Sequence, residues 1–305
     1  MNGLAKKLWT KSMCAEVNNF RTRDVWIPRN LLKIQEMGRK AVGTKWVFKM
    51  KHEPNNIVRY KSRIVVLGYL QIPGLDYTEK FSPTATDTST RLVIAIALAY
   101  AEIGWICDLF DVEAAFLNSE MENVMYIKWP PGMVELGFMT QEEFNTTCAE
   151  LKMAMYGNVD AALLWIRTLT AFLVEKCGMK QSITDPCIFY MKDTEGQLKM
   201  VLSVHVDDVM VSGKQADVDD LKAKVKAKFG ISDLGRVKKH LGMMYDWSED
   251  EKGPYVKITM EKNATDIISK YEKHVGHSVK VSKTPGFPGK VLEKNSGDPV
   301  DMEIF

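Results

Sequence analysis

The sequence lacks the features that mark several large classes of protein. Its five cysteines are odd in number and include no Cys-x-x-Cys pair, so neither a disulfide framework nor a zinc ribbon is indicated, and a reducing, intracellular setting is expected. The longest uninterrupted apolar run, residues 92–101, is too short to cross a bilayer. No secretory signal, phosphate-binding loop or dinucleotide-binding fingerprint is found. Nothing therefore points to a secreted, membrane-spanning or P-loop protein.

The charge is distributed unevenly along the chain. Hydrophobic residues at 46% and charged residues at 26% describe an ordinary globular protein with a net charge of +2. Residues 1–70, however, hold 15 Lys and Arg against 4 Asp and Glu, a net of +11, which leaves −9 for residues 71–305. A basic N-terminal part suits a phosphate-rich partner. A solvated basic face without any ligand explains the same charge.

Two stretches that lie far apart in the sequence carry carboxylates at strand ends. Residues 201–213 read as two β-branched apolar runs flanking Asp207 and Asp208, a pattern typical of a hairpin with adjacent carboxylates in its turn. Residues 105–111 read as an apolar strand that ends on Asp111. Paired aspartates are common turn formers, so the hairpin alone needs no function. If the two strands are neighbours, three carboxylates converge.

Three converging carboxylates would be a ligand set for magnesium. Oxygen ligands suit Mg²⁺, which keeps several waters and is usually held by one or two carboxylates together with substrate phosphates. Two such ions about 3.5–4 Å apart can clamp the attacking and leaving oxygens of a phosphoryl displacement. The carboxylates therefore indicate polymerase or nuclease chemistry.

Other segments predict a mixture of helices and strands. Alternating basic and apolar residues at 45–51 and 58–67, with turn residues at 54–56 between them, predict a hairpin whose cations either hold a triphosphate or form an exposed face. Thr88, Ser89 and Thr90 are candidate caps of a helix that runs to about Gly104, and a second helix is predicted near 161–176. A third, at 218–229, carries lysines at 222, 224, 226 and 228 on an expected solvated face, and the tail from about residue 283 is expected to be poorly ordered.

An ordered series of short motifs connects these segments. With them the chain resembles the reverse transcriptase domain of copia-type LTR retrotransposons over about residues 20–285. The motifs are Lys45-Trp46-Val47-Phe48-Lys49, Tyr60-Lys61-Ser62-Arg63-Ile64-Val65, Phe81-Ser82-Pro83, Phe110-Asp111-Val112-Glu113-Ala114-Ala115-Phe116-Leu117-Asn118, Tyr126-Ile127-Lys128-Trp129-Pro130-Pro131-Gly132, Leu151-Lys152, Tyr156-Gly157, Trp165, Asp185-Pro186-Cys187, His205-Val206-Asp207-Asp208, Asp233-Leu234-Gly235 and Leu241-Gly242.

The resemblance implies an α+β right-hand polymerase fold, in which a palm with an antiparallel sheet and helices is flanked by fingers and a partial thumb. The chain also resembles a fragment of a Pol polyprotein, because no protease, integrase or RNase H region is recognised in it. The implied divisions are fingers at 1–88, palm at 89–119, a fingers insertion at 120–155, palm again at 156–245, and a partial thumb with the tail at 246–305.

The resemblance also implies roles for individual residues. Two Mg²⁺ ions, or Mn²⁺ in their place, would be bound by Asp111, Asp207 and Asp208 and would promote nucleotidyl transfer from a dNTP to a primer 3′ hydroxyl. The implied nucleotide-binding residues are Lys61 and Arg63 from the fingers, the backbone N–H groups of Val112 and Glu113, Phe116 as the steric gate against a 2′ hydroxyl, and Asp160. The implied primer grip is Leu241, Gly242 and Met243.

The chain departs from the family pattern next to the site. Asp160 stands where the family has a nucleotide-contacting Gln, and His205 stands where it has the Tyr beside the aspartates. Two cations are also lost, since Val159 and Leu163 stand where the family has Lys and Arg, and Ala162 replaces a Pro. An acid facing a polyanionic ligand would weaken binding. The leading hypothesis is an RNA-directed DNA polymerase acting on a primed RNA or DNA template. The alternatives are a non-catalytic, decayed remnant that keeps the fold and binds nucleic acid, and a metal-dependent nuclease.

The resemblance finally suggests partners and a location. Integrase and RNase H domains of the same polyprotein are expected partners, and no membrane partner is expected. The cytoplasm, within a virus-like particle, is the expected location, with the nucleus as an alternative.

Overall fold

The computed structural model describes residues 3–52 and 58–279. The chain divides into two compact units, Met1–Arg236 and Val237–Phe305, which are described separately. The expected turn at 54–56 and the expected tail from about residue 283 lie outside the described residues. Among the described residues, no helix combines the length and the apolar character needed to cross a membrane.

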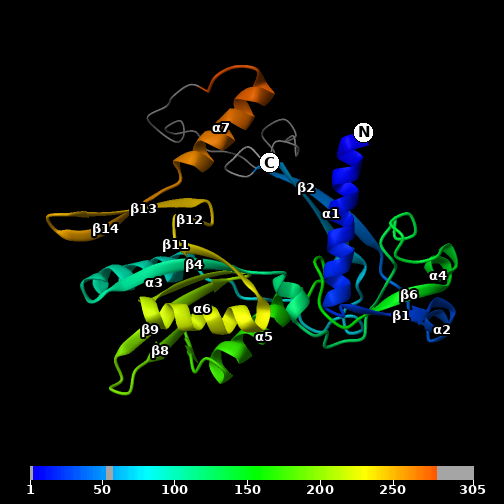
Figure 1. Cartoon of the computed structure of the whole chain (residues 1–305), viewed down its shortest axis with the longest axis horizontal. Helices are drawn as coiled ribbons and strands as arrows, with labels where there is room; N and C mark the ends of the chain where they lie inside the picture. Colours follow the sequence, from blue (N-terminus) through cyan, green and yellow to red (C-terminus); the bar gives the residue numbers. More distant parts are fainter. Residues whose placement is uncertain (1–2, 53–57, 280–305) are drawn as a thin grey trace, which may run out of the picture. The chain divides into compact units, whose positions relative to one another are not determined.

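The first unit contains most of the secondary structure (Figure 1). Its helices are α1 (Gly3–Thr22), α2 (Leu31–Glu36), α3 (Asp87–Ala99), α4 (Gln141–Thr146), α5 (Ala161–Glu175) and α6 (Gln215–Phe229), with 3₁₀ turns η1 (Gly68–Leu70), η2 (Ala101–Ile103) and η3 (Ala115–Asn118). Its strands are β1 (Trp26–Asn30), β2 (Thr44–His52), β3 (Val58–Val66), β4 (Trp105–Val112), β5 (Tyr126–Ile127), β6 (Thr147–Leu151), β7 (Lys180–Gln181), β8 (Ile188–Lys192), β9 (Leu198–His205), β10 (Asp208–Lys214) and β11 (Ile231–Arg236).

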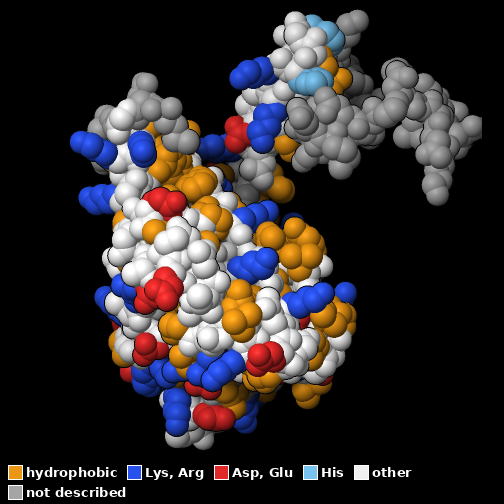
Figure 2. Space-filling model, turned by 90° about the vertical axis from the view of Figure 1, so that its right-hand side faces the viewer, with side chains coloured by type: hydrophobic (Ala, Val, Ile, Leu, Met, Phe, Trp, Pro, Cys, Tyr) orange, Lys and Arg blue, Asp and Glu red, His pale blue; other side chains and the backbone are white. Residues whose placement is uncertain are grey.

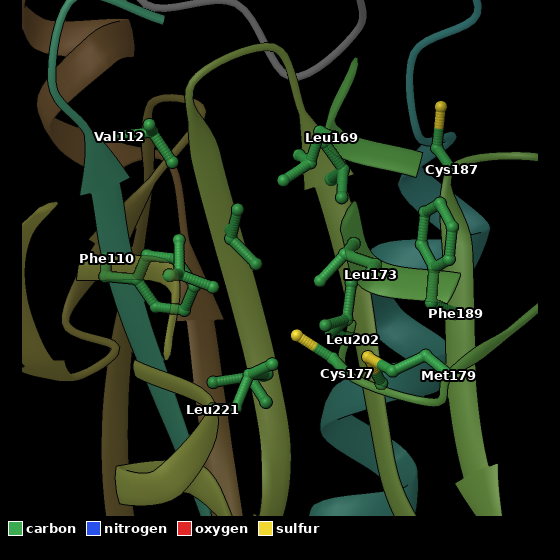
Figure 3. Packing of buried hydrophobic residues seen from close by; sticks show 14 of the residues in the cluster. Phe110, Val112, Leu169, Leu173, Cys177, Met179, Cys187, Phe189, Leu202 and Leu221 are labelled. Atoms are coloured by element: carbon green, nitrogen blue, oxygen red, sulfur yellow. The ribbon is translucent and has the colours of Figure 1, made fainter. Parts of the chain in front are cut away.

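A six-stranded antiparallel sheet forms the centre of this unit, in the order β11-β4-β10-β9-β8-β7. Its middle strands are apolar on both faces because both faces are covered. Helices α5 and α6 pack on one face, where Phe110, Leu169, Leu202 and Leu221 belong to one buried cluster (Figure 3). Helix α3 lies on the other face, against β4, β9 and β10.

The second part of this unit is built from N-terminal strands and a segment after β4. Strands β1, β6 and β5 form a three-stranded sheet, and β2 and β3 form a separate hairpin. Its core includes Val17 and Phe20 of α1, Ile64 of β3 and Ile127 of β5, all with no exposed surface. Helix α1 packs onto β3, and its side chains Val17 and Phe20 belong to the core that it shares with the strand.

The second unit is smaller. Strands β12 (Lys239–His240), β13 (Met243–Asp250) and β14 (Gly253–Thr259) form an antiparallel sheet, followed by α7 (Glu261–Val275). The residue patterns at 240–246 and 254–260 predict two strands and the pattern at 264–274 predicts a helix, and the structure confirms these elements.

Two local expectations are corrected. The cap of α3 is Thr86, whose side chain accepts a hydrogen bond from the Ser89 backbone N–H, and is therefore earlier than the predicted cap at 88–90. Lys222 does not lie on a solvated face, since only 6% of it is exposed. The lysine is tolerated in the interior because two acids, Asp108 and Asp233, reach its ammonium group.

Candidate active site

Strand pairing brings the three predicted carboxylates together. In the antiparallel register of β4 and β10, Asp111 is directly opposite Asp208. The Val112 backbone N–H donates to the carbonyl of Asp207 at 2.8 Å, which ties the end of β4 to the turn between β9 and β10. On its other side, Asp111 is opposite Ser232 of β11. The expected pairing of the two strands is confirmed, since Asp111 and the turn with Asp207 and Asp208 lie at the same end of neighbouring strands.

The carboxylates repel one another where they meet. Burial raises the pKa of Asp111 to about 6, and the negative charges of Asp207 and Asp208 add to this effect. The nearby ammonium groups of Lys61 and Lys51 lower it in part. Because like charges in a partly desolvated site favour a bound cation, this cluster is a candidate cation site.

The carboxylates fit magnesium chemically without forming a complete cage. Within residues 3–52 and 58–279, no group of three or more His, Cys, Asp or Glu side chains has an arrangement that could hold a metal ion. Magnesium is commonly bound by one or two carboxylates, with waters and substrate phosphates supplying the remaining ligands. One or two of these aspartates could therefore supply carboxylate ligands to a magnesium ion whose other ligands are waters and phosphates.

The turn that carries Asp207 and Asp208 is held in a strained conformation. Val206 has φ 59°, a left-handed conformation that is costly for a β-branched residue, about 1–3 kcal/mol. The indole N–H of Trp165 on α5 donates to the carbonyl of Val206 at 2.6 Å. Trp165 is fully buried and packs edge-to-face against Phe229 of α6. Two helices beneath the sheet therefore fix the backbone of the aspartate turn.

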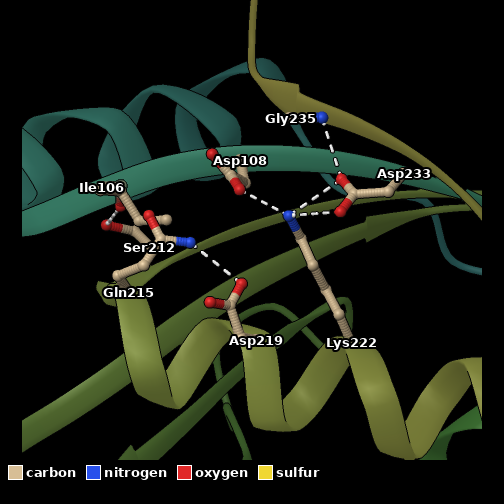
Figure 4. Close-up of polar contacts among 8 residues, drawn as sticks. All are labelled: Ile106, Asp108, Ser212, Gln215, Asp219, Lys222, Asp233 and Gly235. Carbon is tan, nitrogen blue, oxygen red and sulfur yellow. Dashed lines mark hydrogen bonds and ion pairs between the residues drawn. The ribbon is translucent and has the colours of Figure 1, made fainter.

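A partly buried charge network supports β4 at Asp108, close to Asp111. The ammonium group of Lys222 on α6 is 2.5 Å from a carboxylate oxygen of Asp108 on β4 and 2.9 Å from one of Asp233 on β11 (Figure 4). The Gly235 backbone N–H donates to Asp233 and orients this second carboxylate. Burial lowers the pKa of Lys222, but the hydrogen bonds that its ammonium group donates to both acids outweigh this effect, so the pKa is raised and the lysine stays charged.

A cleft of about 700 Å³ opens beside Asp111, whereas Asp207 and Asp208 are not among its lining residues. It is lined by α1, by the β2–β3 hairpin and by residues around Asp111. Its cationic lining residues are Lys11, Arg23, Lys51, Arg59, Lys61 and Arg63. Lys and Arg side chains are spread over the face seen in Figure 2, with acidic side chains scattered among them.

The cations that were predicted from the β2–β3 motifs do line this cleft. Burial lowers the pKa of Lys61, and the charges of Arg63, Lys51 and Arg59 lower it further, as expected where cations crowd together. The Arg63 guanidinium lies 4.8 Å from the ring centroid of Tyr156, within cation–π range. Anionic phosphate groups would relieve the repulsion among these cations.

The backbone donors expected at Val112 and Glu113 are already in use. The Val112 N–H donates to Asp207, and the Glu113 N–H donates to the Gly230 carbonyl at 3.2 Å. The expectation that they bind a triphosphate is therefore not met in this conformation, because both N–H groups donate to backbone carbonyls at the end of β4. The side chain of Glu113 lines the cleft.

Phe116 lies behind the cleft surface. It is partly buried in η3 and contacts Tyr156 edge-to-face, with centroids 5.5 Å apart. Tyr156 lines the cleft, whereas Phe116 is not among the lining residues. The sequence indicated no role for Tyr156, although Tyr156-Gly157 was among the recognised motifs. Gly157 explains the motif, since it has φ +89° and a Cβ there would lie 2.2 Å from the Val66 carbonyl.

Asp160 is not in the cleft. It precedes α5, is 3% exposed, and has one carboxylate oxygen without a hydrogen-bond partner among the described residues. Burial raises its pKa. The expectation that it faces the nucleotide is not met here, because the Gly157 turn leads the chain into the interior. Because Asp160 lies outside the cleft, its carboxylate would not repel a bound triphosphate, as its place in the motif had suggested.

The expected primer-grip residues belong to the second unit. Leu241 and Gly242 form a left-handed turn, with φ 48° and 80°, between β12 and β13, and Met243 is buried at the start of β13. Their role as a primer grip stays a prediction.

Comparison with known proteins assigns the family. The sequence model described as "Reverse transcriptase (RNA-dependent DNA polymerase)" matches residues 30–281. The chain belongs to this family. The expected α+β polymerase fold and the resemblance to copia-type elements are thereby confirmed.

The similar proteins are Pol polyproteins of retrotransposons. The chain is 29% identical over 261 residues to the "Retrovirus-related Pol polyprotein from transposon TNT 1-94" of Nicotiana tabacum, covering 81% of this chain and 19% of that protein. It is 31% identical over 238 residues to the corresponding polyprotein from transposon RE2 of Arabidopsis thaliana, covering 78% and 15%. The chain therefore spans less than a quarter of the curated relatives it matches.

The chain also matches a yeast retrotransposon polyprotein and the solved structure of a viral protein. The "Truncated transposon Ty1-A Gag-Pol polyprotein" of Saccharomyces cerevisiae is 23% identical over 299 residues, covering 95% of this chain and 23% of that protein. The solved structure of a foamy viral protease-reverse transcriptase in complex with double-stranded DNA covers 85% of this chain and 36% of that chain, at a TM-score of 0.37 and 11% identity.

Proposed function

We propose that this chain is an RNA-directed DNA polymerase domain that adds deoxynucleotides to a primer 3′ hydroxyl. The observation that carries the proposal is the meeting of Asp111, Asp207 and Asp208 beside a cleft lined by cations. Carboxylates supply the metal-binding side of such a site, and cations supply the phosphate-binding side. Membership of the reverse transcriptase family agrees with this division.

Each residue has a role that follows from its position. Bound Mg²⁺ or Mn²⁺ would activate the primer hydroxyl and neutralise charge on the phosphates. Asp111, Asp207 and Asp208 would hold the ions, and Lys61 and Arg63 would bind the triphosphate from the opposite wall of the cleft.

Discrimination against ribonucleotides is assigned to two aromatic rings in edge-to-face contact. Tyr156 forms the cleft surface and Phe116 supports it from behind. A rigid ring against the sugar would leave no space for a 2′ hydroxyl. Replacing Phe116 with Ala should therefore relax the choice between dNTP and rNTP.

The remaining expectations extend this proposal. Other Pol polyprotein domains are proposed partners, as the relatives' names suggest.

An intracellular location is proposed because the five cysteines are free thiols, four of them buried. Fractionation of cells that express the full polyprotein would test it, and recovery from the medium would contradict it.

Primer extension on an RNA template with Mg²⁺ or Mn²⁺ tests the function. Wild type should extend the primer, Asp207→Asn should reduce the rate by at least about a thousandfold, and Asp219→Asn, on the exposed face of α6, should not. Binding of primed template without extension by wild type would favour a non-catalytic remnant. Degradation of template without added dNTP would indicate a nuclease.

A further inference from the structure

Helix α1 completes the open edge of β3. Strand β3 pairs with β2 on one side only, so alternate N–H groups point away from the hairpin. The Ser62 N–H donates to the hydroxyl of Ser12 at 2.8 Å, and the Ile64 N–H donates to the carboxylate of Glu16 at 3.3 Å. The Val66 N–H donates to the Tyr156 carbonyl at 2.8 Å. Side chains of α1 therefore take the place of a third strand.

This contact places a carboxylate among the cations of the cleft. Glu16 lines the cleft together with Lys61 and Arg63, which flank the residues whose N–H groups α1 binds. Burial raises the pKa of Glu16, whereas the Ile64 N–H, Arg63 and Lys61 lower it. Among the described residues, Glu16 makes no ion pair within 4.0 Å, so its charge acts on the cations at longer range.

Helix α1 also lies before the part of the chain that identifies the family. The matching sequence model begins at residue 30, whereas α1 ends at Thr22. The catalytic and phosphate-binding residues are all inside the matched part. Glu16 is therefore an additional charge in the cleft that comes from a helix outside the matched part of the chain.

We propose that Glu16 is an internal counter-ion that competes with the nucleotide triphosphate for Lys61 and Arg63 and thereby limits nucleotide affinity. The inference rests on the proposed polymerase function, because that function makes a nucleotide triphosphate the ligand of the cleft. A triphosphate entering the cleft would meet the cations and this carboxylate together, so part of the attraction is offset by repulsion. In the empty cleft the same carboxylate stabilises the crowded cations. Glu16 is a residue that sets nucleotide affinity and does not take part in the chemical step.

Glu16→Gln separates the charge from the hydrogen bond. The amide oxygen of Gln can still accept from the Ile64 N–H, while the negative charge is lost. The KM for dNTP should fall about 3- to 10-fold, as expected for removing one partly screened charge, and kcat should stay within about twofold. Glu36→Gln, an exposed residue of α2, removes the same charge elsewhere and is the matched control.

A binding measurement keeps the inference independent of catalysis. Calorimetric titration of the full chain with inorganic tripolyphosphate in EDTA should show about 3- to 10-fold tighter binding by Glu16→Gln than by wild type. The difference should disappear in the Lys61→Met, Arg63→Met background, because Glu16 acts through these cations. Glu16→Met, which also lacks the charge, replaces the Gln variant if that variant fails to fold.

The outcomes separate the two proposals. If wild type extends primers but Glu16→Gln changes neither KM nor tripolyphosphate affinity, the counter-ion role is refuted and the polymerase assignment stands. If Glu16→Gln tightens tripolyphosphate binding while no condition gives extension, the counter-ion role is supported and the polymerase assignment fails. Tighter binding by Glu36→Gln as well would show a general charge effect and would overturn the role of Glu16.

Discussion

The carboxylate cluster should destabilise the protein until a cation binds it. The pKa of Asp111 is raised from 3.8 to about 6 by burial and by Asp207 and Asp208. Two pKa units correspond to about 3 kcal/mol, which we reduce to about 1–1.5 kcal/mol because Asp111 is partly exposed to solvent. Asp111→Asn, which removes the charge at nearly constant shape, should therefore raise the stability of the metal-free protein by about that amount.

The pH dependence of this effect follows from its sign. Below the unfolded pKa of 3.8, Asp111 is protonated in both states and the substitution should have no electrostatic effect. As the pH rises through about 6, the folded protein becomes charged at Asp111 at a cost, so the advantage of the Asn variant should grow and then level off. A low pKa in the folded state would give the opposite trend.

Thermal unfolding in EDTA at pH 4, 6 and 8 measures this difference. Asp111→Asn should unfold about 2–4 °C above wild type at pH 8 and at nearly the same temperature at pH 4. Added Mg²⁺ should raise the unfolding temperature of wild type more than that of the variant. The exposed Glu135→Gln is the control. A variant that is less stable than wild type at pH 8, or a pH-independent difference, would refute the electrostatic reasoning.

Three further substitutions test the supports of the site. Trp165→Phe removes the indole that holds the Val206 carbonyl and should lower kcat about tenfold with little change in KM for primed template, which steady-state kinetics would measure. Lys222→Met leaves Asp108 buried and unpaired and should cost about 3 kcal/mol in chemical denaturation; an unchanged midpoint would contradict the network. Asp160→Asn should stabilise the protein by about 1 kcal/mol at pH 8 but not at pH 4, because burial raises the pKa of Asp160; equal effects at both pH values would argue against this cause.

The central arrangement could be predicted from the sequence because it follows from local patterns. Alternating and continuous apolar runs define β4 and the β9–β10 hairpin, and each ends at a carboxylate. When these strands pair antiparallel with their carboxylate ends together, Asp111 lies opposite Asp208. The motif resemblance added the family, which the comparisons confirm.

The corrected expectations depend on contacts between distant residues. Asp160 was assigned to the nucleotide by its place in a motif, but the Gly157 turn sends it into the interior. Lys222 follows the spacing of a solvated helix face, and its burial depends on Asp108, which is 114 residues away in sequence. The pattern of residue types around Lys222 does not predict a buried carboxylate partner so far away in the sequence.

The role of α1 was also beyond sequence reasoning. Its basic residues and weak boundaries gave no sign that Ser12 and Glu16 would satisfy the edge of a strand about 50 residues later. The N–H groups of Val112 and Glu113 illustrate the same limit, because a backbone donor is available only if the tertiary structure leaves it free.

The most direct test of the central claim is the binding of Mn²⁺ in the presence of primed RNA template and a non-hydrolysable dNTP, followed by electron paramagnetic resonance. Wild type and Asp219→Asn should bind the ion with equal affinity, and single Asn substitutions at Asp111, Asp207 and Asp208 should each weaken binding at least about tenfold. Equal affinity in all five proteins would show that the three carboxylates do not bind the metal and would contradict the account.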